Sequence, residues 1–299
     1  MADTGASILA KLKNKAASSG IAYHQCLQLF MQEEFLRRLS KSPYVDNMIL
    51  KGGLFIYTLC NFDSRTTVDI DFLLRKMDYD QKSIAEMIDI ILAVKTGSDI
   101  VEFRAGKVEP IALQREYHGI SLQIIGSIKN VRVPFNLDIG IGDIIVPKPE
   151  KRAIQTQLDG YDAPEILTYS LESTIAEKLD AMLQRLELTS RMKDFYDIYY
   201  LALSFNFDGH ILQDAIEQTL NNRRTHFEND SFDRIIQLSE DKDIQIRWRH
   251  FLHKLMQPDL DLTKVLKIIE IFLHPIFEAI VNKVNYKKMW KCKSQKWDE

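Results

Sequence analysis

Two aspartates, Asp69 and Asp71, stand two residues apart in the segment VDID and are the strongest chemical signal in the sequence. Residues two apart on a β-strand project to the same face, so the two carboxylates would lie side by side. Adjacent carboxylates repel one another unless they share a cation, and Mg²⁺ is typically held by one or two carboxylates together with substrate phosphates. Val68, Ile70 and Phe72 would anchor the opposite face of this strand. The pattern therefore predicts a divalent-metal site, and the alternative is an exposed strand with two solvated aspartates.

A pair of glycines, Gly52 and Gly53, follows a short apolar segment that ends at Lys51. Glycine lets the backbone approach a phosphate closely, and the N-terminus of a helix favours anions. The order strand, glycine pair, helix and acidic strand indicates a phosphate-binding turn, although an ordinary turn has the same residues. Arg65, four residues before Asp69, is a candidate phosphate contact or a residue that closes a surface loop.

A third carboxylate occurs in the segment FNLDIGIGD, where Asp138 is the first candidate and Asp143 the second. If the strand that carries Asp138 pairs with the acidic strand, three carboxylates converge. Such a set could hold two metal ions for an in-line displacement at phosphorus.

Two helical segments in the second half of the chain bring charged residues to an apolar surface. At about 100° per residue, Lys178 lies nearly in line with Leu171 at the edge of an apolar stripe. Arg191 and Asp194 share the apolar face of the next helix, whereas Lys193 points away. Because an unpaired lysine is costly to bury, Lys178 needs an anion. That anion is either a substrate phosphate or a carboxylate in a structural salt bridge.

These motifs occur in an order that resembles a known family. The segments are KGG followed by DID, the DI…GD segment at Asp138–Asp143, LESTIAEKLDAM around Lys178 and RMKDFYDIYYL around Asp194. Over roughly residues 45–200 the chain resembles the DNA-polymerase-β-like nucleotidyltransferases. More specifically, it resembles the AbiEii/AbiGii toxins of bacterial toxin–antitoxin and abortive-infection (phage defence) systems.

The resemblance implies transfer of a nucleoside monophosphate from an NTP to an acceptor, with release of pyrophosphate and dependence on Mg²⁺ or alternatively Mn²⁺. By this likeness the metal ligands are Asp69, Asp71 and Asp138, and the catalytic residues are these three with Lys178 and Asp194. The nucleotide-binding residues implied are Lys51, Gly52, Gly53, Arg65, Lys178 and Arg191. Lys178 would offset charge on the β- and γ-phosphates, and Asp194 would orient Lys178 or Arg191. The third carboxylate would help to deprotonate the acceptor hydroxyl.

The C-terminal segment suggests an acceptor. Lysines attract phosphates and aromatic rings stack on bases, so a segment in which lysines and aromatic residues alternate is typical of RNA binding. The alternative is a frayed terminus whose lysines only increase solubility. The residues concerned are Tyr286, Lys287, Lys288, Trp290, Lys291, Lys293, Lys296 and Trp297.

The resemblance implies further partners. These are GTP or CTP/UTP as the nucleotide, the tRNA 3′ end as the acceptor, and an antitoxin of the winged-helix repressor type encoded nearby. Two other hypotheses remain: a nucleotide- or RNA-binding module without turnover, and transfer to a protein or small-molecule hydroxyl.

The elements that position these residues fall into two halves. We expect an α+β protein with a nucleotidyltransferase-like α/β domain in residues 1–160 and a helical domain in 161–299 that completes the site. Strands are expected at 99–104, 108–114, 120–128 and 131–141, with turns at Gly106, His118–Gly119 and Lys129–Asn130. Helices are expected at 21–40, 80–95, 171–186, 191–203, 211–222, 246–256 and 262–285, the last interrupted by Pro275.

Composition narrows the class of protein. With 299 residues, 45% hydrophobic, 27% charged and a net charge of −3, the chain can bury a large core and is not a histone-like nucleic-acid binder. Three scattered cysteines fit neither a disulfide framework nor a zinc site. The sequence has no signal-peptide pattern and no apolar run of the roughly 20 residues that span a bilayer. We therefore expect a cytoplasmic protein without a membrane partner.

Overall fold

The computed structural model describes residues 4–59, 67, 69–77, 80–97, 100–111, 119–185, 191–255 and 260–299. The chain divides into two compact units. One, the sheet unit, comprises Met1–Gly142 and Glu150–Tyr169, and the other, the helical unit, comprises Asp143–Pro149 and Ser170–Glu299. The expected α+β class is confirmed. The sheet unit continues to Tyr169, beyond the expected boundary at residue 160, whereas the short segment Asp143–Pro149 belongs to the helical unit.

A seven-stranded mixed sheet forms the centre of the sheet unit, with the order β3-β4-β5-β2-β1-β7-β6. Neighbouring strands run antiparallel, except that β2 is parallel to β5 and β1 is parallel to β7. The strands are β1 (Met48–Lys51), β2 (Ile70–Leu74), β3 (Glu102–Ile111), β4 (Gly119–Ile128), β5 (Val131–Gly140), β6 (Glu150–Ala153) and β7 (Glu165–Thr168). This order places the acidic strand β2 directly beside β5, which carries Asp138.

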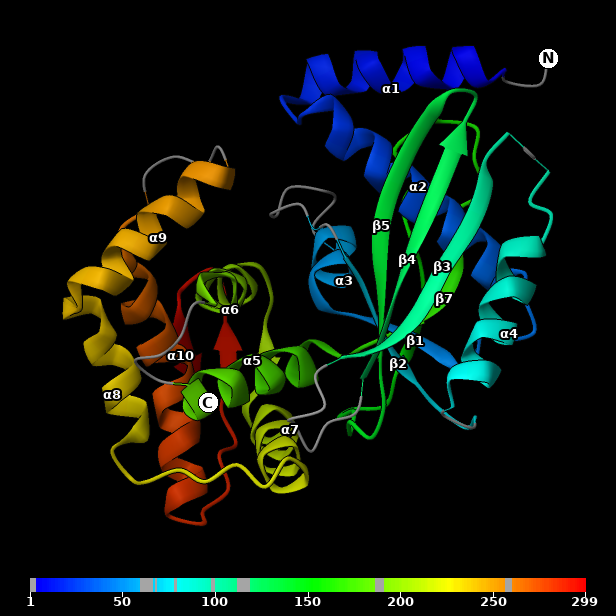
Figure 1. Cartoon of the computed structure of the whole chain (residues 1–299). Coiled ribbons are helices and arrows are strands. Elements are labelled where there is room, and N and C mark those ends of the chain that lie inside the picture. The colour runs from blue at the N-terminus through cyan, green and yellow to red at the C-terminus, as the bar shows by residue number, and fades with distance from the viewer. Residues whose placement is uncertain are drawn as a thin grey trace. The chain divides into compact units, whose positions relative to one another are not determined.

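One face of the sheet packs against α2 (Tyr23–Ser40). Apolar and polar residues alternate along β5, and Phe135 and Leu137 are fully buried. The ring of Phe35 contacts the rings of Phe72 and Phe135, which shows that α2 covers this face. Figure 1 shows α2 running across the sheet. The other helices of the unit are α1 (Gly5–Ser19), α3 (Gly52–Leu59) and α4 (Gln81–Ala93). The polar residues of β2 and β5 therefore lie on the face opposite α2.

A buried ion network runs through the middle of α2. Arg37 Nε lies 2.8 Å from Glu34 Oε2, and Arg38 Nη2 donates to the Val101 carbonyl at 2.6 Å. Glu33 accepts the Gln157 N–H at 3.0 Å. Burial raises the pKa of Glu33 to about 7, although Arg37 and the Gln157 N–H act in the opposite direction. Glu33 therefore titrates near neutral pH within the core of the sheet unit.

The turn predicted at Gly106 is wrong. Glu102–Ile111 is one continuous strand, β3, and its pairing with β4 shifts register between Ala105 and Val108. An extra residue in one strand forms a β-bulge, which bends the strand and keeps the ladder intact on both sides. The turn predicted at Lys129–Asn130 is confirmed, while His118 lies outside the described residues.

The helical unit contains six α-helices among its described residues, together with a small sheet. The helices are α5 (Leu171–Arg185), α6 (Met192–Ser204), α7 (Gly209–Asn222), α8 (Ser231–Gln237), α9 (Lys242–Leu255) and α10 (Leu262–Val281), and a 3₁₀ turn η2 spans Leu238–Glu240. The strands β8 (Phe207–Asp208), β9 (Met289–Lys291) and β10 (Lys296–Asp298) form an antiparallel sheet in the order β10-β9-β8. No described helix is long and apolar enough to cross a membrane.

Two expectations for this unit are corrected. The helix expected to be interrupted at Pro275 is continuous, because α10 runs through Pro275 with Phe272 and Ile276 on either side fully buried. Their packing outweighs the backbone hydrogen bond that proline cannot make. The C-terminal segment is not a frayed terminus: Trp290 is fully buried and its Nε1 donates to the Ala202 carbonyl at 2.7 Å. Trp290 is therefore a core residue and cannot stack on a base.

Candidate active site

A row of four polar residues crosses the face of the sheet opposite α2. Lys51 on β1 is the register partner of Asp71 on β2, Asp71 is the partner of Asp138 on β5, and Asp138 is the partner of Ser121 on β4. Register partners on adjacent strands project to the same face, so these side chains are neighbours. The Ser121 hydroxyl donates to Asp138 Oδ1 at 2.6 Å. The predicted pairing of the acidic strand with the Asp138 strand is thus present.

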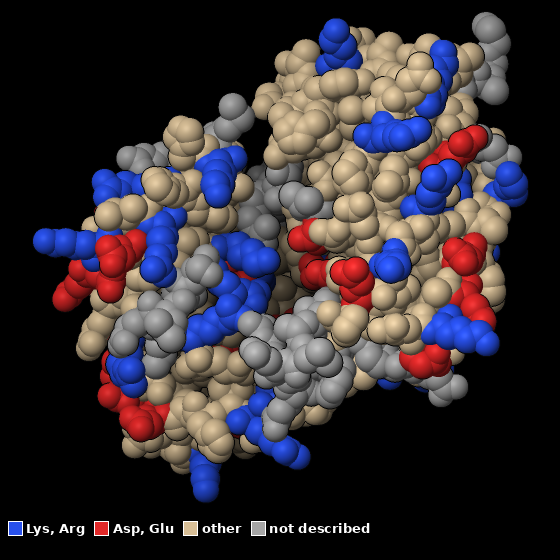
Figure 2. Space-filling model, in the orientation of Figure 1, with Lys and Arg blue, Asp and Glu red and all other residues tan. Residues whose placement is uncertain are grey.

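Asp69 lies one row away on the same face. It immediately precedes β2, and its Oδ1 accepts a hydrogen bond of 3.1 Å from Asn136 Nδ2. Asn136 is two residues before Asp138 on β5, so Asp69, Asp71 and Asp138 all face away from α2. All three carboxylates are half-buried. Figure 2 shows acidic side chains gathered on this face where β2 and β5 lie.

Gly52 makes room for one of these carboxylates. Its φ is +70°, and a Cβ atom at this position would come within 2.1 Å of Asp71 Oδ2. Glycine is therefore favoured at this position for two reasons: the backbone has a left-handed conformation, and the Asp71 carboxylate lies where a side chain would be. Helix α3 begins at Gly52 and includes Gly53, so the Asp71 carboxylate lies at a helix N-terminus, where negative charge is favoured.

The remaining nucleotide-binding candidates of the sheet unit are Lys51 and Arg65. Lys51 Nζ lies 5.1 Å from the centre of the Tyr169 ring, within the range of a cation–π interaction. This contact holds the ammonium group at the end of β1, next to the row of carboxylates. Arg65 lies outside the described residues.

The acidic face fits a metal that the substrate helps to coordinate. Among the described residues, no three His, Cys, Asp or Glu side chains are arranged to hold a metal ion by themselves. Asp71 and Asp138 nevertheless supply carboxylates from adjacent positions of neighbouring strands. Mg²⁺ is commonly bound in this way, by one or two carboxylates and by phosphate oxygens of the substrate.

The helical unit contains a second cluster, in which two aspartates form ion pairs with a lysine and an arginine. Lys178 Nζ on α5 lies 2.6 Å from Asp197 Oδ2 and 3.2 Å from Asp194 Oδ1, both on α6. Arg191 Nε, at the start of α6, lies 2.6 Å from Asp194 Oδ2. The side chains of the two aspartates are 1% exposed and that of Lys178 is 9% exposed, whereas that of Arg191 is 34% exposed. Arg191 is therefore the more accessible of the two cations to a phosphate, and Lys178 is largely engaged by carboxylates.

Sequence reasoning missed Asp197. The signal was present, because Asp197 follows Asp194 by three residues and so lies on the same face of the helix. The prediction that Asp194 orients Lys178 or Arg191 stays a prediction for catalysis, and the structure has both contacts.

Asp143, the second candidate for the third carboxylate, has a different environment from Asp138. It belongs to the helical unit, where Arg223 Nη2 lies 2.8 Å from Asp143 Oδ1 and 2.9 Å from Glu177 Oε1. Arg223 Nη1 also lies 2.9 Å from Asp180 Oδ2. Burial alone would lower the pKa of Arg223, but the carboxylates of Glu177, Asp143 and Asp180 outweigh it and raise this pKa. Asp143 is thus part of a buried ion cluster, while Asp138 lies in the acidic row of the sheet.

Comparison with known proteins relates the chain to a known family. Residues 34–283 match the family model described as "Nucleotidyl transferase AbiEii toxin, Type IV TA system". No curated protein matches the chain. Two solved structures share the fold at 16% sequence identity. MenT4, a nucleotidyltransferase toxin from Mycobacterium tuberculosis H37Rv, has a TM-score of 0.53, covering 93% of this chain and 99% of its own. JHP933 from Helicobacter pylori has a TM-score of 0.50, covering 88% of this chain and 95% of its own.

Proposed function

The chain belongs to the AbiEii family of nucleotidyltransferase toxins of type IV toxin–antitoxin systems, and on this premise we propose that it transfers a nucleoside monophosphate from an NTP to the 3′ end of tRNA with the help of Mg²⁺. The observation that carries the proposal is the pairing of Asp71 with Asp138 on adjacent strands, with both carboxylates on the sheet face opposite α2. We also propose that it acts in the cytoplasm, where NTPs and tRNA meet, in phage defence. Its proposed antitoxin is a winged-helix repressor.

In the proposed reaction, an acceptor hydroxyl oxygen forms a bond to the α-phosphorus of the NTP. The bond between the α-phosphorus and the bridging oxygen to the β-phosphorus breaks, pyrophosphate leaves, and the hydroxyl proton passes to a carboxylate. Bound Mg²⁺ supplies neutralisation of phosphate charge and polarisation of the phosphoryl group. Asp71 and Asp138 would hold the metal, and Asp69 is the third acid of this face. The proposed proton acceptor is Asp138.

Two neighbouring side chains position these acids. Ser121 fixes one oxygen of Asp138, and Asn136 fixes one oxygen of Asp69. Groups that orient metal-binding side chains typically contribute 10- to 100-fold to affinity or activity, as a rough guide. Catalysis of this kind depends on positioning and electrostatics, so a rigid sheet is an appropriate support.

We assign the positive groups different tasks. Lys51 is held at the end of β1 beside the acidic row, where it can neutralise a phosphate. Arg191 contacts the triphosphate in the proposal because its side chain is the accessible one in its cluster. Lys178 is buried between Asp194 and Asp197, so it acts mainly by holding α5 and α6 together and thereby fixing Arg191.

The test is incorporation of each α-³²P-labelled NTP into total cellular RNA in the presence of Mg²⁺. Asp71→Asn and Asp138→Asn are each expected to lower labelling at least about 100-fold, because they remove charge from the metal site. The matched control is Glu102→Gln, an exposed carboxylate on β3 of the same sheet. The nucleotide that labels RNA identifies the substrate, and sequencing the labelled band identifies the acceptor.

The same assay separates the competing hypotheses. Unchanged labelling in Asp71→Asn would contradict the proposed site. Labelling of a protein band or of a small molecule in place of RNA would assign the acceptor to another hydroxyl. Absence of any labelled product, with NTP still bound, would favour a binding module without turnover.

A further inference from the structure

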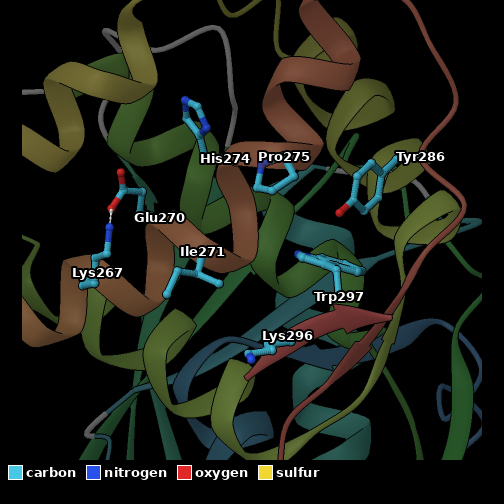
Figure 3. Close-up of a pocket in the computed structure, with 8 residues that line it drawn as sticks. All are labelled: Lys267, Glu270, Ile271, His274, Pro275, Tyr286, Lys296 and Trp297. Atoms are coloured by element: carbon cyan, nitrogen blue, oxygen red, sulfur yellow. Dashed lines mark hydrogen bonds and ion pairs between the residues drawn. The ribbon is translucent and has the colours of Figure 1, made fainter. Parts of the chain in front are cut away.

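A pocket lies on the helical unit between α10 and the C-terminal segment. Its volume is about 450 Å³, within the range of sites that bind small molecules. Figure 3 shows Lys267, Glu270 and Ile271 on α10 at one side of the opening, and Tyr286, Lys296 and Trp297 at the other. The pocket thus combines aromatic, apolar and cationic side chains in a segment of the chain that contains none of the proposed transfer residues.

Trp297 is held in a fixed orientation in this pocket. Its ring stacks on Phe272 with a centroid distance of 5.8 Å and an interplanar angle of 8°, and its Nε1 donates to the Phe272 carbonyl at 3.1 Å. Tyr286 meets it edge to face at 5.0 Å. The chain has three tryptophans, all of them described, and Trp248 and Trp290 are only 2% and 0% exposed. Trp297 is half-buried, so it is the tryptophan that a ligand can reach.

The C-terminal segment that contributes Tyr286, Lys296 and Trp297 to the pocket is rich in lysine. Residues 283–299 contain six lysines and two acidic residues, although the whole chain carries a net charge of −3. Lys267 forms an exposed ion pair with Glu270 at 2.7 Å. Exposed pairs of this kind contribute little to stability, so Lys267 can exchange Glu270 for a phosphate.

We propose that this pocket binds one nucleotide of a single-stranded RNA, with the base against Trp297 and the adjoining phosphates at Lys267 and Lys296. The planar base matches a rigid aromatic ring, and Glu270 can accept a hydrogen bond from a base amino group. An acidic peptide brings carboxylates but no such planar base or base N–H groups. The inference deepens the proposed function, on whose RNA acceptor it rests, by adding a second RNA contact remote in sequence from the transfer residues.

The experiment measures tryptophan fluorescence of the full chain during titration with a 12-nucleotide single-stranded RNA, without NTP. Stacking of a base on Trp297 is expected to quench the wild-type signal, and Trp297→Phe is expected to abolish the quenching while keeping the packing on Phe272. The variant Lys267→Gln/Lys296→Gln is expected to lose roughly tenfold in affinity. The slope of log affinity against log salt should fall by about 1.4, since each phosphate contact on a single strand contributes about 0.7.

The matched control is Lys242→Gln/Lys254→Gln, which removes two exposed lysines from α9 of the same unit. Absence of quenching in the wild type, or an equal loss of affinity in the control, would overturn the inference. Equal quenching by hexaglutamate would also overturn it and assign the pocket to acidic peptides.

RNA labelling separates the two proposals. If wild-type protein labels RNA and the pocket variants bind RNA normally, only the pocket inference fails. If RNA quenches Trp297 but is never labelled, the proposed function fails and the pocket inference stands.

Discussion

Lys178 provides a test of whether a charged residue that the family resemblance assigns to catalysis acts in chemistry or in folding. Its ammonium group lies between two aspartates whose side chains are 1% exposed. Removing one partner of a buried ion pair typically costs about 3–5 kcal/mol, because the other charge stays buried without compensation. Lys178→Met leaves Asp197 without this partner and Asp194 with Arg191 alone. We therefore expect a loss of about 4 kcal/mol in the unfolding free energy of the helical unit.

Urea denaturation measures this loss. With a denaturant slope of about 2 kcal/mol per molar, the midpoint of unfolding should fall by about 2 M. The fluorescence of Trp248 and Trp290 is a suitable signal, because both are buried in the helical unit. Lys193→Met, which removes an exposed lysine from α6, is the matched control and should change stability by less than about 0.5 kcal/mol.

A second variant separates folding from catalysis. Lys178→Met/Asp197→Asn removes one positive and one negative charge, so Arg191 and Asp194 remain as a balanced pair. We expect it to recover most of the lost stability. If Lys178→Met unfolds at the wild-type urea concentration, or the double variant is no more stable than Lys178→Met, the buried-pair reasoning is refuted. A stable double variant without transferase activity would show that Lys178 or Asp197 is needed for the reaction itself, directly or by positioning Arg191, and not only for stability.

Three further predictions concern other residues. Glu33 has a pKa that rises from 4.5 to about 7 on folding, so the native state binds more protons between these values and the unfolding free energy falls as the pH rises. We therefore expect the unfolding free energy of Glu33→Gln, relative to that of the wild type, to increase by about 2–3 kcal/mol between pH 5 and pH 8, as measured by urea denaturation. A difference in unfolding free energy that does not change with pH would contradict this. Gly52→Ala should lower transferase activity at least about tenfold because its Cβ would displace Asp71, whereas Gly20→Ala, with a similar φ of +73° and nothing within 4 Å of its Cβ, should cost only about 1–2 kcal/mol of stability. Asp143→Asn should reduce the unfolding free energy by about 1–3 kcal/mol, because it weakens the ion cluster around Arg223. The transferase activity per folded molecule should stay the same, and a complete loss of that activity would make Asp143 the third catalytic acid.

Local patterns in the sequence were sufficient for many elements. Alternation predicted the acidic strand, and helical spacing placed Asp194 on the buried face of α6 and Lys193 on its exposed face. Such patterns are readable because a strand repeats every two residues and a helix every 3.6. They do not depend on which other segments the element contacts.

Other features depend on partners distant in the sequence. A glycine between two strand-like segments suggested a turn at Gly106, but pairing with β4 keeps β3 continuous through a bulge. Burial of Phe272 and its neighbours keeps α10 helical across Pro275. Trp290, which resembled an RNA-stacking residue, fills the core beneath the C-terminal sheet.

The family, the α+β class and the identity of the acidic strand could be read from the amino-acid sequence, because these follow from short motifs in a fixed order and from local periodicity. Which acid stands beside Asp71 depends on long-range strand pairing. Asp138 and Asp143 are five residues apart and chemically equal, but strand pairing brings one to the acidic row and Arg223 holds the other in the helical unit. The same is true of Lys178, whose burial between two aspartates is a property of how α5 and α6 pack and not of either segment alone.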